Sequence, residues 1–249
     1  MTDTDYDGAI ALIGMSGRFP GADSVSGLWR DLLAGVKGLR EITEDELAAA
    51  GVTPEQAADP EYVRVGGPLP QVDLFDAAVF GFSPREAETM EPQHRMFLEC
   101  SWEALESAGY CPTDVPGQVG VFGGSGFPHY MIYNVRHVAA EPGGDLLLGV
   151  GNERDSLANL VAYKLGLRGP AITVQTFCST SLVAVHLACQ SLLTYESDIA
   201  LAGGAFIPLP QPAGYHFEPG GIMSPNGRVS SFDAQADGTV MGRDRKSVV

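Results

Sequence analysis

The chain has 249 residues, of which 31 are Asp or Glu and 15 are Lys or Arg, giving a formal net charge of −16. This acidic balance argues against nucleic acid or an anionic membrane surface as a partner. Residues 1–7 lack the basic and apolar segments of a secretory signal, and no apolar run reaches the length that spans a membrane. We therefore expect a cytoplasmic globular protein that binds neither nucleic acid nor membrane.

The four cysteines show no spacing typical of a metal site, so the sequence predicts no bound metal. Cys178 and Cys189 lie on one predicted helix, roughly 16 Å apart along its axis, which is too far for a disulfide. Cys100 shares an apolar helix face with Phe97 and Ala104 and is expected in the core. Reduced thiols agree with a cytosolic compartment.

The predicted elements alternate between strands and helices, an order typical of a parallel-rich α/β fold. Strands are predicted over residues 9–13, 118–122, 171–175 and 198–202, and helices over residues 26–34, 92–108, 155–165 and from 179 onward. Residues 36–82 have irregular polarity and are expected to form an excursion of short elements rather than a separate domain. Ser83 and Glu86 have the capping-box spacing that starts a helix.

A glycine cluster, Gly123-Gly124-Ser125-Gly126, follows the second predicted strand. A phosphate-binding loop of the Walker A type would need a Gly-Lys-Ser/Thr sequence, which is missing here. The cluster is therefore expected to form a tight turn.

Residues 171–182 contain the most informative pattern of the chain. The β-branched run at 171–175 fits a short buried strand, and apolar residues from Ser179 onward nearly fill the circumference of a helix, as in a helix buried on most sides. With the strand at 198–202, this order predicts a βαβ unit with parallel strands. Cys178 lies between strand and helix, where unpaired N–H groups and the helix dipole favour a thiolate by about 0.3–1 kcal/mol.

Two interpretations of Cys178 stay open on this turn alone. A free cysteine is often a small buried hydrophobe. The other interpretation is a nucleophile that takes an acyl group, with N–H groups of the helix start holding the developing oxyanion and a further base assisting. A serine hydrolase is disfavoured, because Phe177 and Ser179 flank the cysteine where that class needs Gly-x-Ser-x-Gly.

Several blocks of sequence resemble, in the same order, the β-ketoacyl synthase (ketosynthase) domains of modular type I polyketide synthases. They are AIALIGMSGRFPGA at 9–22, EPQHRMFLE at 91–99 with WEALE at 102–106, VQTFCSTSLVAVHLA at 174–188, GGIMSP at 220–225, and FD with ADG within 232–238. The resemblance covers residues 9–242, between a tail at 1–8 and a divergent end at 243–249.

This resemblance implies a thiolase-like α/β layered sandwich, of which the chain is the N-terminal half, with a mostly parallel mixed sheet and a buried central helix. It implies that Cys178 accepts an acyl chain from the phosphopantetheine thioester of an acyl carrier protein. Decarboxylative Claisen condensation with a malonyl-type extender would follow. The domain itself would bind no cofactor, since the carrier protein holds the phosphopantetheine, and the complete domain would be a homodimer.

The chain also departs from the family pattern. Two histidine-containing segments of the family's second half do not occur, so condensation by this chain alone is not expected. Of the five histidines, His94 and His186 are expected to pack in the interior, and His129, His137 and His216 fall in loop-like stretches.

The end of the chain and the residue before the cysteine depart too. Residues 243–246 are four charged residues in a row, a poor central strand, and indicate a frameshift, a gene break or a clipped end. Phe177 stands where small residues are common in the family, and its ring is expected to narrow the acyl pocket or to fill core.

Two other functions remain as alternatives. The first is a non-catalytic truncated half-domain whose uncovered apolar face associates with a partner. The second is a thiolase-like enzyme acting on coenzyme A thioesters, which the block at 91–99 disfavours.

Overall fold

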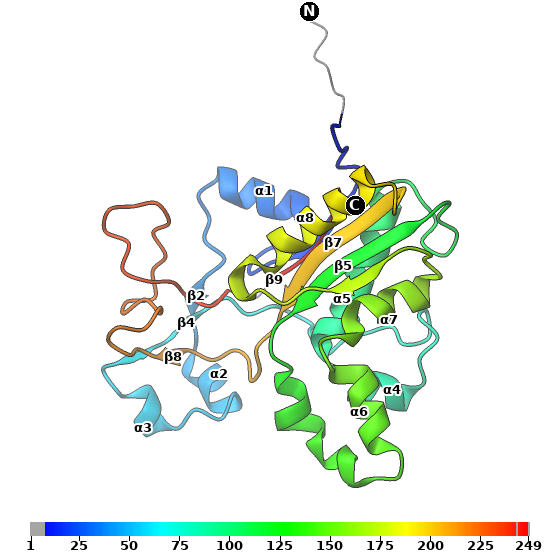
Figure 1. Cartoon of the computed structure of the whole chain (residues 1–249). Helices are drawn as coiled ribbons and strands as arrows, with labels where there is room; N and C mark the ends of the chain where they lie inside the picture. The colour runs from blue at the N-terminus through cyan, green and yellow to red at the C-terminus, as the bar shows by residue number, and fades with distance from the viewer. Residues whose placement is uncertain (1–7, 243, 249) are drawn as a thin grey trace, which may run out of the picture. The chain divides into compact units, whose positions relative to one another are not determined.

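The computed structural model describes residues 8–242 and 244–248 (Figure 1). The predicted tail at 1–8 and the predicted divergent end at 243–249 therefore lie partly outside the described residues. Within the described part, the chain divides into two compact units. Residues 8–17, 72–206 and 245–248 form the first unit, and residues 18–71 with 207–242 and 244 form the second.

The first unit is built on a five-stranded sheet of order β1-β9-β7-β5-β6. Its strands are β1 (Met15–Arg18), β5 (Val119–Ser125), β6 (Ala171–Thr173), β7 (Ile199–Phe206) and β9 (Asp244–Val248). β5 is parallel to both of its neighbours, with Val121 opposite Ala171 of β6 and opposite Leu201 of β7. The order and parallel direction of the predicted βαβ unit are confirmed, with β5 inserted between its two strands. Its first strand, β6, was predicted to be buried but lies at the edge of the sheet with Ile172 exposed.

Helices cover both faces of this sheet and give the unit three layers (Figure 1). They are α4 (Pro84–Thr89), α5 (Pro92–Ser107), α6 (Gly144–Asn152), α7 (Ser156–Leu165) and α8 (Thr180–Leu193), with a π-helical turn η1 (Met131–Val135) and 3₁₀ turns η2 (Arg136–Ala140) and η3 (Phe177–Ser179). α5 and α7 pack against Val121 and Leu201, and α8 packs against Phe122 on the opposite face. Both faces being covered, every residue of β5 is buried.

Most predicted elements of this unit are confirmed, but the strand predicted over 9–13 is wrong. β1 begins only at Met15, and the side chains of Ile10, Leu12 and Ile13 are exposed. A Cβ on Gly14 would overlap the carbonyl oxygen of Ala104, so the chain passes close to the end of α5 before it joins the sheet. The apolar run predicted burial, but it carries no information on which strand it would pair with.

Two further predictions are corrected by the sheet. The glycine cluster is no tight turn, because Gly123, Gly124 and Ser125 are the last residues of β5. The charged end does form a strand, since β9 lies between β1 and β7. Strand pairing uses backbone N–H and C=O groups, which every residue except proline supplies, so a run of charged residues does not prevent it.

The second unit consists of short elements, as predicted for residues 36–71, whereas residues 72–82 of the predicted excursion belong to the first unit. They are α1 (Val25–Leu33), β2 (Arg40–Glu41), α2 (Glu44–Ala49), α3 (Pro54–Ala57), β3 (Tyr62–Val63), β4 (Val65–Gly66) and β8 (Tyr215–His216). β2 pairs with β4 and β3 pairs with β8, both antiparallel. Because β8 comes from the later segment, residues 207–242 join residues 18–71 in a compact unit that the sequence did not indicate.

Capping explains where the short helices of this unit begin. Thr43 with Glu46 and Thr53 with Gln56 form capping boxes at the starts of α2 and α3, and Ser24 caps α1. None of the helices in the described residues combines the length and apolar character needed to cross a membrane.

Candidate active site

Cys178 lies in the 3₁₀ turn η3, after β6 and immediately before the residues that start α8. The predicted position at a strand-to-helix turn is therefore confirmed. Its side chain is exposed, which excludes the interpretation of a small buried hydrophobe. The thiol is reachable from solvent at the carboxyl end of a parallel strand, the edge where α/β sheets commonly bind ligands.

Hydroxyl groups hold this turn together. The N–H of Thr176 donates to Thr180 Oγ1 at 3.0 Å, and Ser179 Oγ donates to the carbonyl oxygen of Thr176 at 2.9 Å. Phe177, between them, has a φ of +51°, in the left-handed region that a bulky residue rarely adopts. A strained residue persists where its surroundings determine the backbone, and such residues cluster at functional sites.

Two glycines let the start of α8 approach the sheet. Gly124 of β5 and Gly204 of β7 are partners across the parallel ladder. A Cβ on Gly124 would overlap both the carbonyl oxygen of Val174 and the Cγ2 of Thr180, and a Cβ on Gly204 would lie 3.5 Å from Ser181. The turn that carries Cys178 therefore rests directly on the backbone of β5. A glycine run inside an apolar strand is the signal that could have predicted this contact.

α8 is covered on one side only. Ala184, Ala188 and Ser191 are buried against the sheet, whereas Leu182 is 74% exposed and Leu193 is also exposed. The helix that the resemblance implies is present, but the prediction of burial on most sides holds only for its sheet-facing side. Small residues at the spacing of one helix face explain the close packing there.

Phe177 fills no core, because its side chain is 99% exposed. Replacing Phe177 by glycine is expected to raise the free energy of unfolding by about 1 kcal/mol, since relief of the left-handed conformation outweighs the greater freedom of the unfolded chain. Urea denaturation measures the change. Phe177→Ala keeps the Cβ and is expected to leave the urea midpoint unchanged. Equal stabilisation by both variants would show that the backbone at Phe177 is not strained.

Comparison with known proteins identifies the family. A family model described as the N-terminal domain of β-ketoacyl synthases matches residues 7–243. This chain belongs to the β-ketoacyl synthase family. Its relatives include two different subunits of the phenolphthiocerol/phthiocerol polyketide synthase of Mycobacterium tuberculosis. One is 45% identical over 245 residues, which are 95% of this chain and 16% of that protein. The other is 42% identical over 96% of this chain and 16% of that protein.

Solved ketosynthase structures share the fold. Ketosynthase twelve of the bacillaene polyketide synthase of Bacillus amyloliquefaciens matches with a TM-score of 0.90 and 33% identity, over 98% of this chain and 43% of that one. The ketosynthase of module 1 of the bacillaene synthase from the same species matches with a TM-score of 0.80 and 30% identity, over 98% and 42%. The fold is thus the thiolase-like α/β fold, and the chain spans less than half of these ketosynthase chains.

The two histidines that were expected in the interior differ in their exposure to solvent. His94 is buried at the start of α5, as predicted, but His186 is exposed on α8. His186 lies two residues beyond Ala184, which places it off the sheet-facing side of the helix. Among the described residues, Cys178 makes no hydrogen bond to a histidine, so a histidine partner for the thiol was not found by sequence or by structure.

The start of α5 contains a buried polar cluster, of which the sequence predicted only His94. Glu91, Gln93 and His94 are almost fully buried, and Arg95 is buried beside them. Burial raises the pKa of the Glu91 carboxyl to about 7 and lowers the pKa of the His94 imidazole to about 4. All four side chains belong to the EPQHR part of the block that resembles ketosynthases, but only His94 was predicted to be buried.

A candidate set of metal ligands lies in the second unit. Asp59, Glu61 and His216 each place a ligand atom within 4.8 Å of the others, and all three residues are exposed. His216 Nε2 lies 3.2 Å from Asp59 Oδ2, and this hydrogen bond raises the pKa of His216. The imidazole of His216 is therefore already paired with a carboxylate, and nothing else at these residues indicates a metal.

Proposed function

We propose that Cys178 is the acyl-accepting nucleophile of a polyketide ketosynthase. The observation that carries the proposal is an exposed thiol in a strained turn between a parallel strand and a helix. Membership of the ketosynthase family and the polyketide synthases among the relatives support it. The substrate would be an acyl chain carried as a thioester.

In the proposed step, the Cys178 thiolate attacks the carbonyl carbon of an acyl thioester. A carbon–sulfur bond to Cys178 forms, the bond to the carrier thiol breaks, and the proton released by Cys178 goes to the departing thiolate. N–H groups at the start of α8 are suited to stabilise the negative oxygen that develops between these events. The acyl group is then held as a thioester of Cys178.

The partners proposed for this step are acyl carrier protein domains that present the acyl chain and a malonyl-type extender on phosphopantetheine. The complete domain would act as a cytoplasmic homodimer and bind no cofactor of its own. Condensation needs stabilisation of an enolate, which the family's two histidine segments would supply, and these segments do not occur in the sequence. We therefore expect this chain to become acylated without forming a carbon–carbon bond.

Intact-mass measurement tests the proposal. The chain, incubated with an acyl-pantetheine thioester, is expected to gain the mass of one acyl group, and Cys178→Ala is expected to lose this adduct. Cys111 is also an exposed cysteine and provides the matched control, because Cys111→Ala should be labelled like the unsubstituted chain. Equal labelling of Cys178→Ala would defeat the proposal.

A non-catalytic role in association is the second candidate. Exposed apolar side chains on α8, such as Leu182 and Leu193, and in the segment before β1, such as Leu12, favour it. Sedimentation would then show concentration-dependent oligomers, together with no acyl adduct. A monomer that becomes acylated would exclude this role as the main function.

A further inference from the structure

Gln93 is fully buried in the first turn of α5, and its amide joins three groups. Its Oε1 accepts a hydrogen bond from the N–H of Gly126 at 2.8 Å. Its Nε2 donates to the carbonyl oxygen of Phe127 at 3.2 Å and to Glu91 Oε1 at 3.0 Å. One side chain thus binds both an N–H and a carbonyl group of the segment that follows β5.

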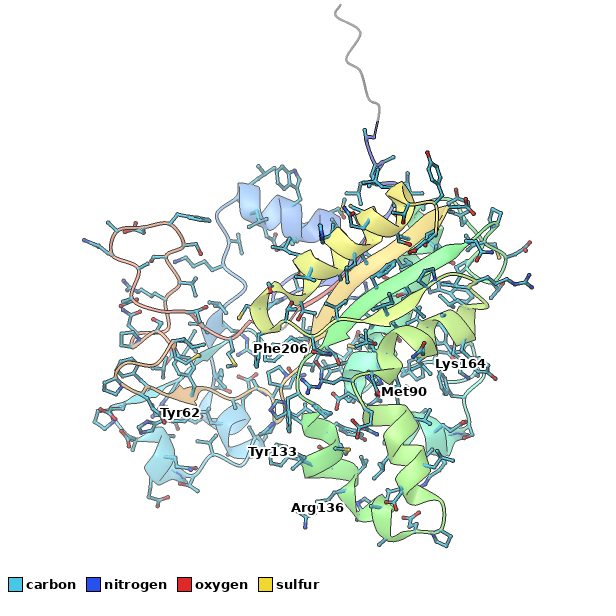
Figure 2. All side chains as sticks on the ribbon, in the orientation of Figure 1. Tyr62, Met90, Tyr133, Arg136, Lys164 and Phe206 are labelled. Carbon is cyan, nitrogen blue, oxygen red and sulfur yellow. The ribbon has the colours of Figure 1, made fainter. Side chains whose placement is uncertain are left out.

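This segment is also the point where the β5–β7 ladder ends. The N–H of Gly126 is shared between Gln93 and the carbonyl oxygen of Ala205, which is 3.0 Å away. A Cβ on Gly126 would overlap the ring of Phe206, so the backbone here has no room to shift toward β7. In Figure 2, the labels of Met90, just before α5, and Phe206, at the end of β7, help the reader to find this part of the first unit.

Gln93 acts together with Phe97, one helical turn further along the same face of α5. A Cβ on Gly123 would lie 2.5 Å from the Phe97 ring, so this ring packs directly on the β5 backbone. On the opposite face, Gly124 contacts Val174 and Thr180, which flank the cysteine turn. The last residues of β5 are therefore held from one side by α5 and carry the turn of Cys178 on the other.

From this geometry we infer that Gln93 is a positioning residue, which fixes the carboxyl end of β5 beneath the turn that presents Cys178. The inference rests on the proposed acyl-accepting role of Cys178. Gln93 acts through Gly126 and Gly124 rather than by contact with the reacting atoms. Glu91 orients the amide, because its Oε1 accepts from Nε2 and leaves the amide oxygen of Gln93 directed at Gly126.

The test compares two reactions of Cys178 in the full chain. Acyl transfer from an acyl-pantetheine thioester requires an aligned thiol, whereas alkylation by iodoacetamide requires mainly an accessible one. Gln93→Met keeps the length of the side chain and removes its hydrogen bonds. We expect it to slow acylation about tenfold while alkylation changes less than about twofold. Gln190→Met, an exposed glutamine on α8, is the matched control and should change neither rate.

An exchange of the two side chains provides the rescue. In Glu91→Gln with Gln93→Glu, the new amide at position 91 donates to the carboxyl group at position 93, whose oxygen replaces the Gln93 amide oxygen as acceptor from the N–H of Gly126. Two of the three contacts return, so acylation should recover by at least about threefold relative to Gln93→Met. A purely structural role would instead lower the urea midpoint and slow both reactions in parallel, which would overturn the inference. An unchanged acylation rate in Gln93→Met would overturn it as well.

Hydrogen exchange separates failure of this inference from failure of the proposed function. If the unsubstituted chain is not acylated, the proposed role of Cys178 fails. The amides of residues 124–127, 129 and 130 are then still expected to exchange faster in Gln93→Met than in the unsubstituted chain. Unchanged exchange in this segment would overturn the positioning role whatever the chemistry of Cys178.

Discussion

Replacing Gly124 by alanine is expected to destabilise the first unit by about 3 kcal/mol and to slow acylation of Cys178 more than tenfold. The added Cβ overlaps the Val174 carbonyl and the Thr180 side chain, and neither is the flexible end of a long side chain. Relief therefore requires the start of α8 to move off the sheet, and Cys178 moves with it. Urea denaturation and the rate of acyl-adduct formation measure the two effects.

Gly204→Ala is the matched control for this prediction. Gly204 faces Gly124 across the ladder, but its added Cβ would lie 3.5 Å from Ser181, an ordinary van der Waals distance. Its stability is expected to stay within about 1 kcal/mol of the unsubstituted chain, because alanine also suits a strand better than glycine does. If the two variants behave alike, the start of α8 does not rest on Gly124.

Stability is expected to change little between pH 5 and 6.5 because two buried groups oppose each other. The pKa of Glu91 is raised to about 7 in the folded chain. The stability that Glu91 contributes is therefore fully present below the pKa of 4.5 in the unfolded chain and is lost as the pH rises toward 7. The pKa of His94 is lowered to about 4 in the folded chain. The stability that His94 contributes is therefore fully present above the pKa of 6.5 in the unfolded chain and is lost as the pH falls toward 4. Between pH 5 and 6.5 the two contributions to the free energy of unfolding therefore change with pH in opposite directions.

Single substitutions should reveal each slope. In Glu91→Gln, the free energy of unfolding is expected to rise by about 2 kcal/mol from pH 5 to 6.5, and in His94→Gln it should fall by about 2 kcal/mol. Arg95 and Tyr130 are the neighbours that lower the pKa of Glu91 in part, and Asp155 acts in the same way to raise the pKa of His94 in part. Urea denaturation followed by Trp102 fluorescence, with Trp29 replaced by Phe, reports on the unit that contains α5. If the free energy of unfolding changes with pH in the same direction in both variants, the assignment of opposite pKa shifts to Glu91 and His94 is wrong.

The cysteine turn could be predicted because its signals are local. A β-branched run, a break in the apolar pattern at Cys178 and a helical pattern after it specify strand, turn and helix without reference to the rest of the chain. The capping box at Ser83 is equally local and was confirmed. The sequence block around Cys178 also matched the family that the comparison then showed.

The parts that could not be predicted depend on distant partners. Gly124 reads as a turn residue until Val174 and Thr180 are known to lie against it. The charged strand β9 pairs through its backbone, which the sequence pattern does not record. His186 was predicted in the core because the residues of α8 are apolar around the whole helix. Only the position of the sheet determines which side of α8 is buried. Gln93 is an ordinary polar residue until Gly126 is placed beside it.

Peptide mapping of the acylated chain tests the central claim most directly. Chymotrypsin cuts after Phe177 and after the leucines that follow, which separates Cys178 from Cys189 and lets fragmentation assign the acyl group to one sulfur. We expect the acyl group to be found on Cys178 and to be released by hydroxylamine, as a thioester should be. An acyl group on Cys111 or Cys189 with Cys178 unmodified would contradict it.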